Sequence, residues 1–299
     1  MNYHFEKNMA IQASFRKITK EILNEAILEC NSKDLTQQEK IHSLRKKCKR
    51  IRGLFRIVRP NIGDLYKKEN VSFRDLARTI SKSRDEHATI ETLEKLQNIC
   101  KDESINNDIA SLKNELSSEH KSEEIILLLK EFELKILNKV SQIDNWQVQS
   151  DGFSSVSGGI KKTYRRGQIA MWKAFNNPTM ENYHEWRKRV KYHYYHLELI
   201  TPIWEAILIY YTNEVHNLSE MLGYDHDLCL LEILLKTKTD YFPNTISIEA
   251  LIKFINSEKI NIREKINVLG QKVYAERPGK LIYKLDIWWN TWEIENSDV

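Results

Sequence analysis

The segment His42-Ser43-Leu44-Arg45-Lys46-Lys47-Cys48-Lys49 recurs 142 residues later as His184-Glu185-Trp186-Arg187-Lys188-Arg189-Val190-Lys191. The same spacing separates Pro60 from Pro202, and Asp85 from Asp227. Lysine and arginine are common, so one or two matching positions would mean little. A constant spacing that holds from histidine through proline to aspartate predicts that the chain contains an internal duplication.

The composition around this repeat favours helices. The 299 residues are 41% hydrophobic and include only 9 glycines and 5 prolines, where an average protein of this length has roughly 12% of the two together. So few turn-forming residues argue against a β-sandwich or barrel. Apolar residues recur at helical spacing through most of the chain, which predicts an all-α fold. The predicted helices span residues 8–30, 36–59, 73–100, 104–118, 121–145, 160–177, 179–202, 203–236, 247–257, 260–276 and 280–293.

One stretch interrupts the helical pattern. Residues 150–159 are rich in glycine and serine and have no apolar period, which is typical of a flexible linker. We therefore expect a first helical half over residues 1–148, a linker over 149–159 and a second helical half over 160–299.

The four cysteines and the apolar runs bear on the compartment. Cys30, Cys48, Cys100 and Cys229 are scattered and predict reduced thiols rather than a disulfide framework or zinc site. The N-terminus lacks the apolar run of a signal peptide, and no stretch approaches the roughly 20 apolar residues of a membrane helix. We expect a cytoplasmic protein with no membrane partner.

The first repeat lies on a helix with an unusual charge pattern. Residues 41–59 contain eight basic side chains and no acidic one, although the net charge of the whole chain is only +4. Like charges one helical turn apart repel each other by a few tenths of a kcal/mol. Unrelieved repulsion of this kind is expected of a surface that binds an anion. The residues that share one helical face are His42, Arg45, Lys46, Lys49, Arg52 and Arg56, with Arg50 beside them.

The second repeat carries a similar row. It contains His184, Arg187, Lys188 and Lys191, and then departs from the first repeat at Tyr194. If the two copies pack about a twofold axis, the two rows could line one groove for a long polyanion. Further candidate contacts come from basic clusters near the start of each half: Arg16 and Lys17 in the first, and Lys161, Arg165 and Arg166 in the second.

The paired His-x2-Arg-Lys motifs closely resemble those of the CHAD family, the conserved histidine α-helical domain. Leu222-Gly223-Tyr224-Asp225-His226-Asp227-Leu228 resembles a second element of that family, and Arg84-Asp85 resembles it more loosely. The resemblance covers almost the whole chain. It implies two antiparallel four-helix bundles related by pseudo-twofold duplication, with a basic surface that binds inorganic polyphosphate. It also implies possible association with polyphosphate granules, here in a standalone form without a triphosphate-tunnel domain.

Each feature also has a purely structural interpretation. The basic rows could be solvated faces that meet acidic neighbours in the fold, and His42 and His184 could be structural histidines. For Asp85 and Asp227 the structural interpretation is the stronger one, because a carboxylate among cations would orient them and repel an anionic ligand. The seven tryptophans fit packing better than base stacking; they are Trp146, Trp172, Trp186, Trp204, Trp288, Trp289 and Trp292.

Two other functions compete with polyphosphate binding. A metal-dependent phosphohydrolase would need a first shell of carboxylates and neutral imidazoles, whereas each histidine here is followed by several cations. RNA or another nucleic acid would bind any lysine- and arginine-rich groove, but the rows lack the asparagine and glutamine that read bases. We therefore expect a non-enzymatic protein, with no cofactor or metal, that binds polyphosphate.

Overall fold

The computed structural model describes residues 3–81, 85–116, 122–237 and 247–295, with side chains from residue 88 in the second range and from residue 124 in the third. The described chain is all α-helical and contains no strand, which confirms the predicted fold class. The helices are α1 (Ile11–Asn31), α2 (Gln37–Ile57), α3 (Gly63–Thr79), α4 (Asp85–Ile99), α5 (Glu103–Leu116), α6 (Ser122–Val140), α7 (Ser154–Asn176), α8 (Met180–Ile200), α9 (Glu205–Thr237), α10 (Ile248–Val273) and α11 (Pro278–Ile294).

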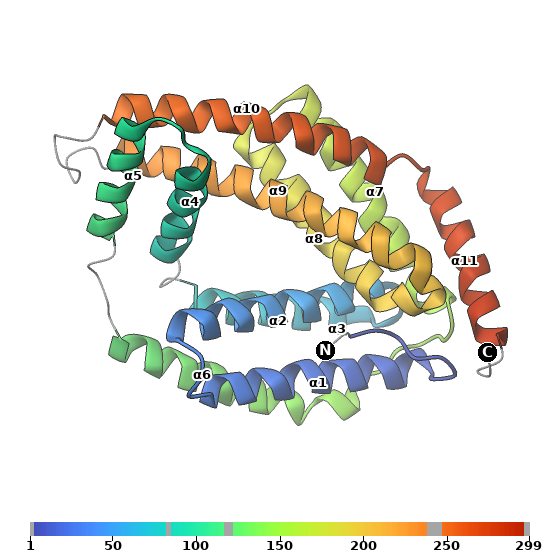
Figure 1. Cartoon of the computed structure of the whole chain (residues 1–299). Helices are drawn as coiled ribbons and strands as arrows, with labels where there is room; N and C mark the ends of the chain where they lie inside the picture. The colour runs from blue at the N-terminus through green and yellow to red at the C-terminus, as the bar shows by residue number, and fades with distance from the viewer. Residues whose placement is uncertain (1–2, 82–84, 117–121, 238–246, 296–299) are drawn as a thin grey trace.

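The helices pack in two groups that meet at α2 (Figure 1). Helices α1, α2, α3 and α6 contact one another, and α8 lies between α7 and α9, which in turn packs against α10. Helix α2 contacts both α7 and α8, so it carries the junction between the groups. Helices α4 and α5 pack against α9 and α10, so a hairpin from the first half of the sequence lies against the second group.

The bounds of the helices follow the repeat in the sequence. Helices α2 and α8 are each 21 residues long, and each begins after a threonine, Thr36 or Thr179, whose hydroxyl caps the first turn. Each is followed by a short 3-10 turn that contains Pro60 or Pro202. The copies differ afterwards, because α9 runs unbroken to Thr237 where the first half has two helices. That two complete bundles are related by a twofold axis stays a prediction.

The prediction of a linker through residue 159 is wrong for its second part, because α7 already begins at Ser154. The glycines in this stretch serve packing rather than flexibility. A Cβ atom on Gly159 would lie 1.9 Å from the backbone oxygen of Ile57, and one on Gly158 would lie 3.1 Å from the Pro60 ring. Only glycine allows α7 to approach the end of α2 this closely.

Two predicted helix boundaries also differ from the structure. Helix α3 begins at Gly63 rather than near residue 73, because Gly63 (φ +48°) takes the left-handed conformation that restarts the chain after the Pro60 turn. Helix α10 runs unbroken from Ile248 to Val273, although the sequence predicts two helices there.

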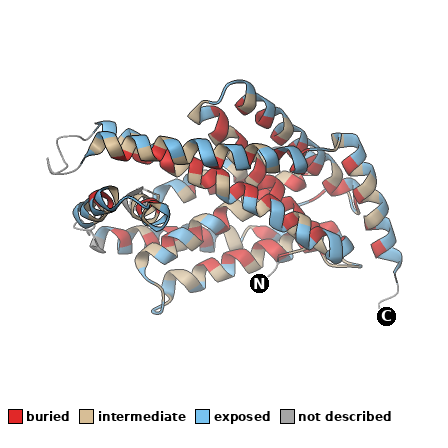
Figure 2. Cartoon of the chain, turned by 45° about the horizontal axis from the view of Figure 1, so that its top comes forward, coloured by how far each residue is buried: buried red, intermediate tan, exposed pale blue. Residues whose placement is uncertain are grey.

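Buried side chains line the sides of the helices that face each other, and exposed ones lie on the outer sides (Figure 2). Trp186 is fully buried, and Phe15, Phe55 and Trp146 form a cluster of tilted and edge-to-face rings in the first group. The prediction that tryptophans serve packing is correct for Trp146, Trp186, Trp289 and Trp292, whereas Trp172 and Trp204 are exposed. Within the described residues, no helix is both long and apolar enough to cross a membrane.

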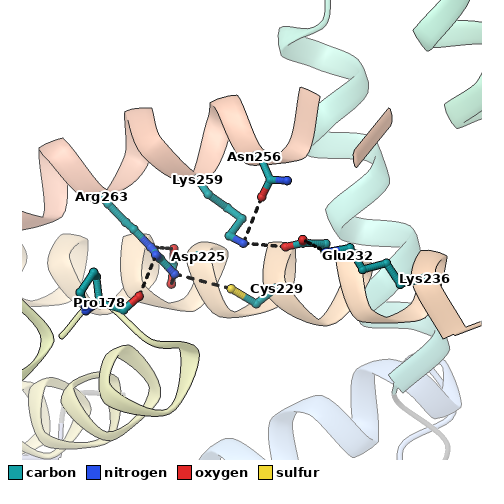
Figure 3. A network of polar contacts seen from close by, with 8 residues as sticks. All are labelled: Pro178, Asp225, Cys229, Glu232, Lys236, Asn256, Lys259 and Arg263. Carbon is teal, nitrogen blue, oxygen red and sulfur yellow. Dashed lines mark hydrogen bonds and ion pairs between the residues drawn. The ribbon is translucent and has the colours of Figure 1, made fainter. Parts of the chain in front are cut away.

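A polar network fixes α9 against α10 (Figure 3). The carboxylate of Asp225, which is only 1% exposed, accepts two hydrogen bonds from the Arg263 guanidinium, the shorter being 2.6 Å. Arg263 also donates to the backbone oxygen of Pro178, which lies just before α8. One turn further along, Lys259 pairs with Glu232 at 2.6 Å. These contacts hold the N-terminal end of α8 in place relative to α9.

Candidate polyanion-binding site

Helices α2 and α8, which carry the two repeats, cross where Gly53 meets Tyr195. A Cβ atom on Gly53 would lie 2.9 Å from the Cβ of Tyr195, so the absence of a side chain at Gly53 sets how closely the helices approach. His196 also reaches across the crossing, with its Nε2 3.2 Å from the backbone oxygen of Gly53. Burial keeps the pKa of His196 well below its usual value, so this ring is neutral and structural.

The row on α2 comes close to cations of α8. His42 and Lys46 are exposed, and Arg45, Lys49 and Arg50 are half-buried. The pKa of Lys46 is lowered by partial burial, by Arg50 on its own helix and by Lys191 across the crossing. Arg45 donates to the backbone oxygen of Ser81 at 3.5 Å, which directs its side chain toward the end of α3.

The row on α8 lies between α2 and α9. The Arg187 guanidinium rests against the backbone of α9, because a Cβ atom on Gly223 would be 3.3 Å from its Nη2. The ring of His184 lies 4.3 Å from that of His226, measured between centroids. Burial lowers the pKa of His184, and the charges of Lys188, Arg187 and Lys49 lower it further. Lys49 belongs to α2, so the two rows do converge.

We use the term basic face for the cations and the histidine that these two helices bring together. Its members are Arg45, Lys46, Lys49 and Arg50 of α2, and His184, Arg187, Lys188 and Lys191 of α8.

Carboxylates neutralise part of the basic face, which corrects the expectation that its charges stay unrelieved. Arg50 pairs with Glu198 at 2.7 Å, Lys191 with Glu220 at 3.0 Å and Lys188 with Glu185 at 2.5 Å. Two of these glutamates are on α8 itself and the third is on α9, so the acid-free sequence of α2 gave no sign of them. Lys46 and Arg187 make no ion pair within the described part of the chain.

Arg52 and Arg56 face another neighbour. Both donate to the side-chain oxygen of Asn70 on α3, at 3.2 and 2.7 Å. The Arg56 guanidinium also lies 3.8 Å from the centre of the Tyr192 ring, a cation–π contact. These contacts hold both arginines at the far side of the crossing from Lys46.

A second group of arginines forms on that side, and the sequence pointed to only part of it. Burial lowers the pKa of Arg166, and the nearby charges of Arg189 and Arg59 lower it further. Arg189 pairs with Glu185 of its own helix. Neither Arg59 nor Arg189 was predicted as a site residue, although Arg189 lies within the second repeat and Arg59 directly precedes Pro60.

The remaining predicted contacts are dispersed. Arg16 donates to the backbone oxygen of Trp146 at 2.9 Å, and Lys17 pairs with Glu6, so both are engaged on the first group of helices. Lys161 and Arg165 are exposed on α7. Tyr194 is buried, and its hydroxyl donates to Glu198 at 2.5 Å.

The aspartates of the repeat have different positions. The side chain of Asp85 lies outside the described residues, and Asp227 is half-buried on α9. The buried carboxylate with a cationic partner in this segment is Asp225, bound to Arg263. The described residues contain no group of three or more histidine, cysteine, aspartate or glutamate side chains that could hold a metal ion.

Comparison with known proteins identifies the family. A model of the CHAD domain matches residues 22–236, a range that runs from α1 to the end of α9 and includes both repeats. Comparison with curated proteins gave no match. Because the matched range covers more than half of the chain, the chain belongs to the CHAD domain family.

Proposed function

We propose that this protein binds inorganic polyphosphate at the basic face, without catalysing its breakdown. The observation that carries the proposal is the convergence of two repeats on one surface: Lys191 of α8 lowers the pKa of Lys46 of α2, and Lys49 of α2 lowers that of His184 of α8. Cations this close together repel each other, and an anion bound between them would remove that cost.

The charges of the basic face favour an extended polyanion over a single small anion. The carboxylates paired with it are Glu185, Glu198 and Glu220, and they are fewer than its lysines and arginines. Hydrogen bonds between cations and phosphate oxygens contribute about 1.5–3 kcal/mol each in favourable settings. A chain with a charge on every phosphate could contact several of these cations at once.

Polyphosphate fits this surface better than RNA because the neighbouring aromatic residues are not accessible. Single-stranded nucleic acids gain much of their affinity from bases stacked on aromatic rings. Tyr192, Tyr194 and Tyr195 follow the α8 row directly, but all three are buried against α2 and α9. A ligand without bases loses nothing by their burial.

We further propose that a twofold relation between the repeats produces the convergence. Arg50 contacts Glu198 and Arg56 contacts Tyr192, and adding 142 to the first residue of each contact gives the second residue of the other. Reciprocal contacts of this kind are expected when two copies of one unit meet at a twofold axis. Gly53 and Tyr195, which are also 142 residues apart, would lie on that axis.

A Glu-x-Glu-x-Lys sequence, the signature of triphosphate-tunnel enzymes, occurs at Glu131-Phe132-Glu133-Leu134-Lys135 and does not alter this proposal. The segment lies on helix α6. Residues two positions apart on a helix point roughly 200° apart, so Glu131 and Glu133 cannot act on one phosphate. Phe132 between them is buried in the core.

The proposal is tested by replacing Arg45, Lys46, Arg187 and Lys188 together with alanine. We expect the variant to keep its helical circular dichroism and to lose binding of fluorescently labelled long-chain polyphosphate. A matched control replaces four exposed lysines elsewhere with alanine: Lys67, Lys68, Lys101 and Lys253. Unchanged binding by the first variant, or equal loss in the control, would refute the proposal.

Two further measurements address the competing functions. Single-stranded RNA should not displace labelled polyphosphate at physiological salt, and displacement would favour nucleic-acid binding. Incubation of polyphosphate with the protein and Mg²⁺ or Mn²⁺ should release no orthophosphate. Association with polyphosphate granules in the cell is part of the proposal and can be followed with a fluorescent fusion protein.

A further inference from the structure

A cavity of about 310 Å³ lies on the second group of helices, where α11 meets α7, α8 and α9. Its floor consists of apolar side chains that are almost completely buried: Leu197, Leu208, Leu281 and Leu285. Protein interiors are normally packed without voids larger than a water molecule. This one has room for roughly ten water molecules, which places it at the lower end of the range for ligand pockets.

The polar groups of the lining are already used within the protein. The Tyr211 hydroxyl donates to the backbone oxygen of Val273 at 2.8 Å, and the Tyr164 hydroxyl donates to that of Glu276 at 3.1 Å. Both bonds fix the connection between α10 and α11. Water needs two to four polar partners to be held in a cavity. With these donors engaged, the cavity suits an apolar body better than a cluster of waters.

The mouth of the cavity is apolar as well. Ile207 on α9 is 44% exposed and lines the cavity beside Trp288 on α11. The ring of Trp288 meets that of Trp204 edge-on, with 4.8 Å between centroids, and Trp204 is 46% exposed. An apolar ligand would therefore keep contact with apolar side chains from solvent to the floor.

The charges at the rim leave an excess of one cation. Lys284 pairs with Glu276 at 2.8 Å and lies 5.3 Å from the centre of the Trp288 ring. Lys272, at the end of α10, is exposed and makes no ion pair within the described residues. An acidic group at the mouth would therefore meet a cation that has no carboxylate of its own.

We propose that this cavity binds a small amphiphilic monoanion, with its apolar body on the leucine floor and its acidic group beside Lys272. The proposal does not depend on polyphosphate binding, because the cavity shares no residue with the basic face. Part of its lining, residues 272–288, lies outside the residues 22–236 that match the CHAD domain. The site is therefore a feature of this chain that family membership does not imply.

The test uses the fluorescent dye 1-anilinonaphthalene-8-sulfonate, which combines an aromatic body with one sulfonate. We expect one dye molecule to bind per folded wild-type protein with enhanced fluorescence. Decanoate should displace the dye, whereas decyltrimethylammonium, with the opposite charge, should not. Absence of dye binding, or equal displacement by both competitors, would overturn the proposal.

Two variants locate the binding. Ile207→Trp narrows the exposed mouth without touching the core, and it should weaken dye binding about tenfold or more. Lys272→Glu should weaken binding about threefold to fivefold, the range expected for an exposed charge. The control Lys253→Glu, an exposed position elsewhere on α10, should have no effect. Wild-type affinity in both test variants would place the dye elsewhere and refute the proposal; polyphosphate binding should be unchanged in all three.

Discussion

Gly53 and Tyr195 occupy equivalent positions in the two repeats, and they touch each other: a Cβ atom on Gly53 would lie 2.9 Å from the Cβ of Tyr195. This contact brings the basic rows of α2 and α8 onto one surface, because the rows lie in the turns that precede it. A glycine in one copy and a tyrosine in the other thus let two similar helices pack closely at a point where two identical large side chains would collide.

The close packing at Gly53 predicts a loss of stability on substitution. Gly53→Ala adds a methyl group at less than van der Waals distance, which should lower the free energy of unfolding by about 1–3 kcal/mol and outweigh the gain of about 0.5–1 kcal/mol from replacing a helical glycine. Urea denaturation measures the change. Gly279→Ala is the control, since a Cβ atom there would meet nothing within 4 Å. Equal effects in the two variants would contradict the packing account.

The buried ion pair between α9 and α10 predicts a larger effect. Asp225→Asn leaves the Arg263 guanidinium without its carboxylate partner in a mostly buried site, which should lower the free energy of unfolding by about 3–5 kcal/mol. The exposed Lys236→Gln should change it by less than about 0.5 kcal/mol. Thermal unfolding followed by circular dichroism compares the two variants. A loss at Asp225 no larger than that at Lys236 would show that this pair does not stabilise the fold.

Burial of His193 predicts that stability falls in acid. Burial lowers the pKa of His193 to about 3, against about 6.5 in the unfolded chain. Below pH ~6.5 the unfolded state takes up a proton that the folded state does not, so stability present at neutral pH is lost as the pH falls toward ~3. At pH ~4 the loss should be about 3 kcal/mol from this residue. Urea denaturation of His193→Phe across this range should show a shallower decline, and an identical decline would contradict the assignment.

The position of His184 predicts the pH dependence of polyphosphate binding. Burial and the neighbouring Lys188 and Arg187 lower its pKa in the free protein. A bound polyanion offsets these cations and raises that pKa, so the complex holds more protons than the free protein. Affinity should therefore increase as the pH falls from ~7.5 to ~6. His184→Gln should weaken this dependence and His4→Gln should not; a wild-type affinity that falls over this range would contradict the prediction.

Local sequence patterns predicted the helices and the two basic rows well. Thr36 and Pro60 mark the limits of α2 in the sequence, and the spacing of its cations defines one face without tertiary information. The carboxylates on that face could not be predicted, because Glu198 reaches Arg50 from 148 residues away and Glu220 reaches Lys191 from another helix. Gly158 and Gly159 were misinterpreted for the same reason: composition does not distinguish a flexible glycine from one that a distant helix contacts.

The central claim is that both rows hold one polyphosphate chain. Isothermal titration calorimetry with polyphosphate of a single defined length tests it in the wild type, in Lys46→Ala, in Arg187→Ala and in the double variant. We predict one chain per protein throughout, with affinity about tenfold weaker in each single variant and weaker still in the double variant. Two chains per wild-type protein, with each single variant losing one of them, would contradict the claim, as would wild-type affinity in the double variant.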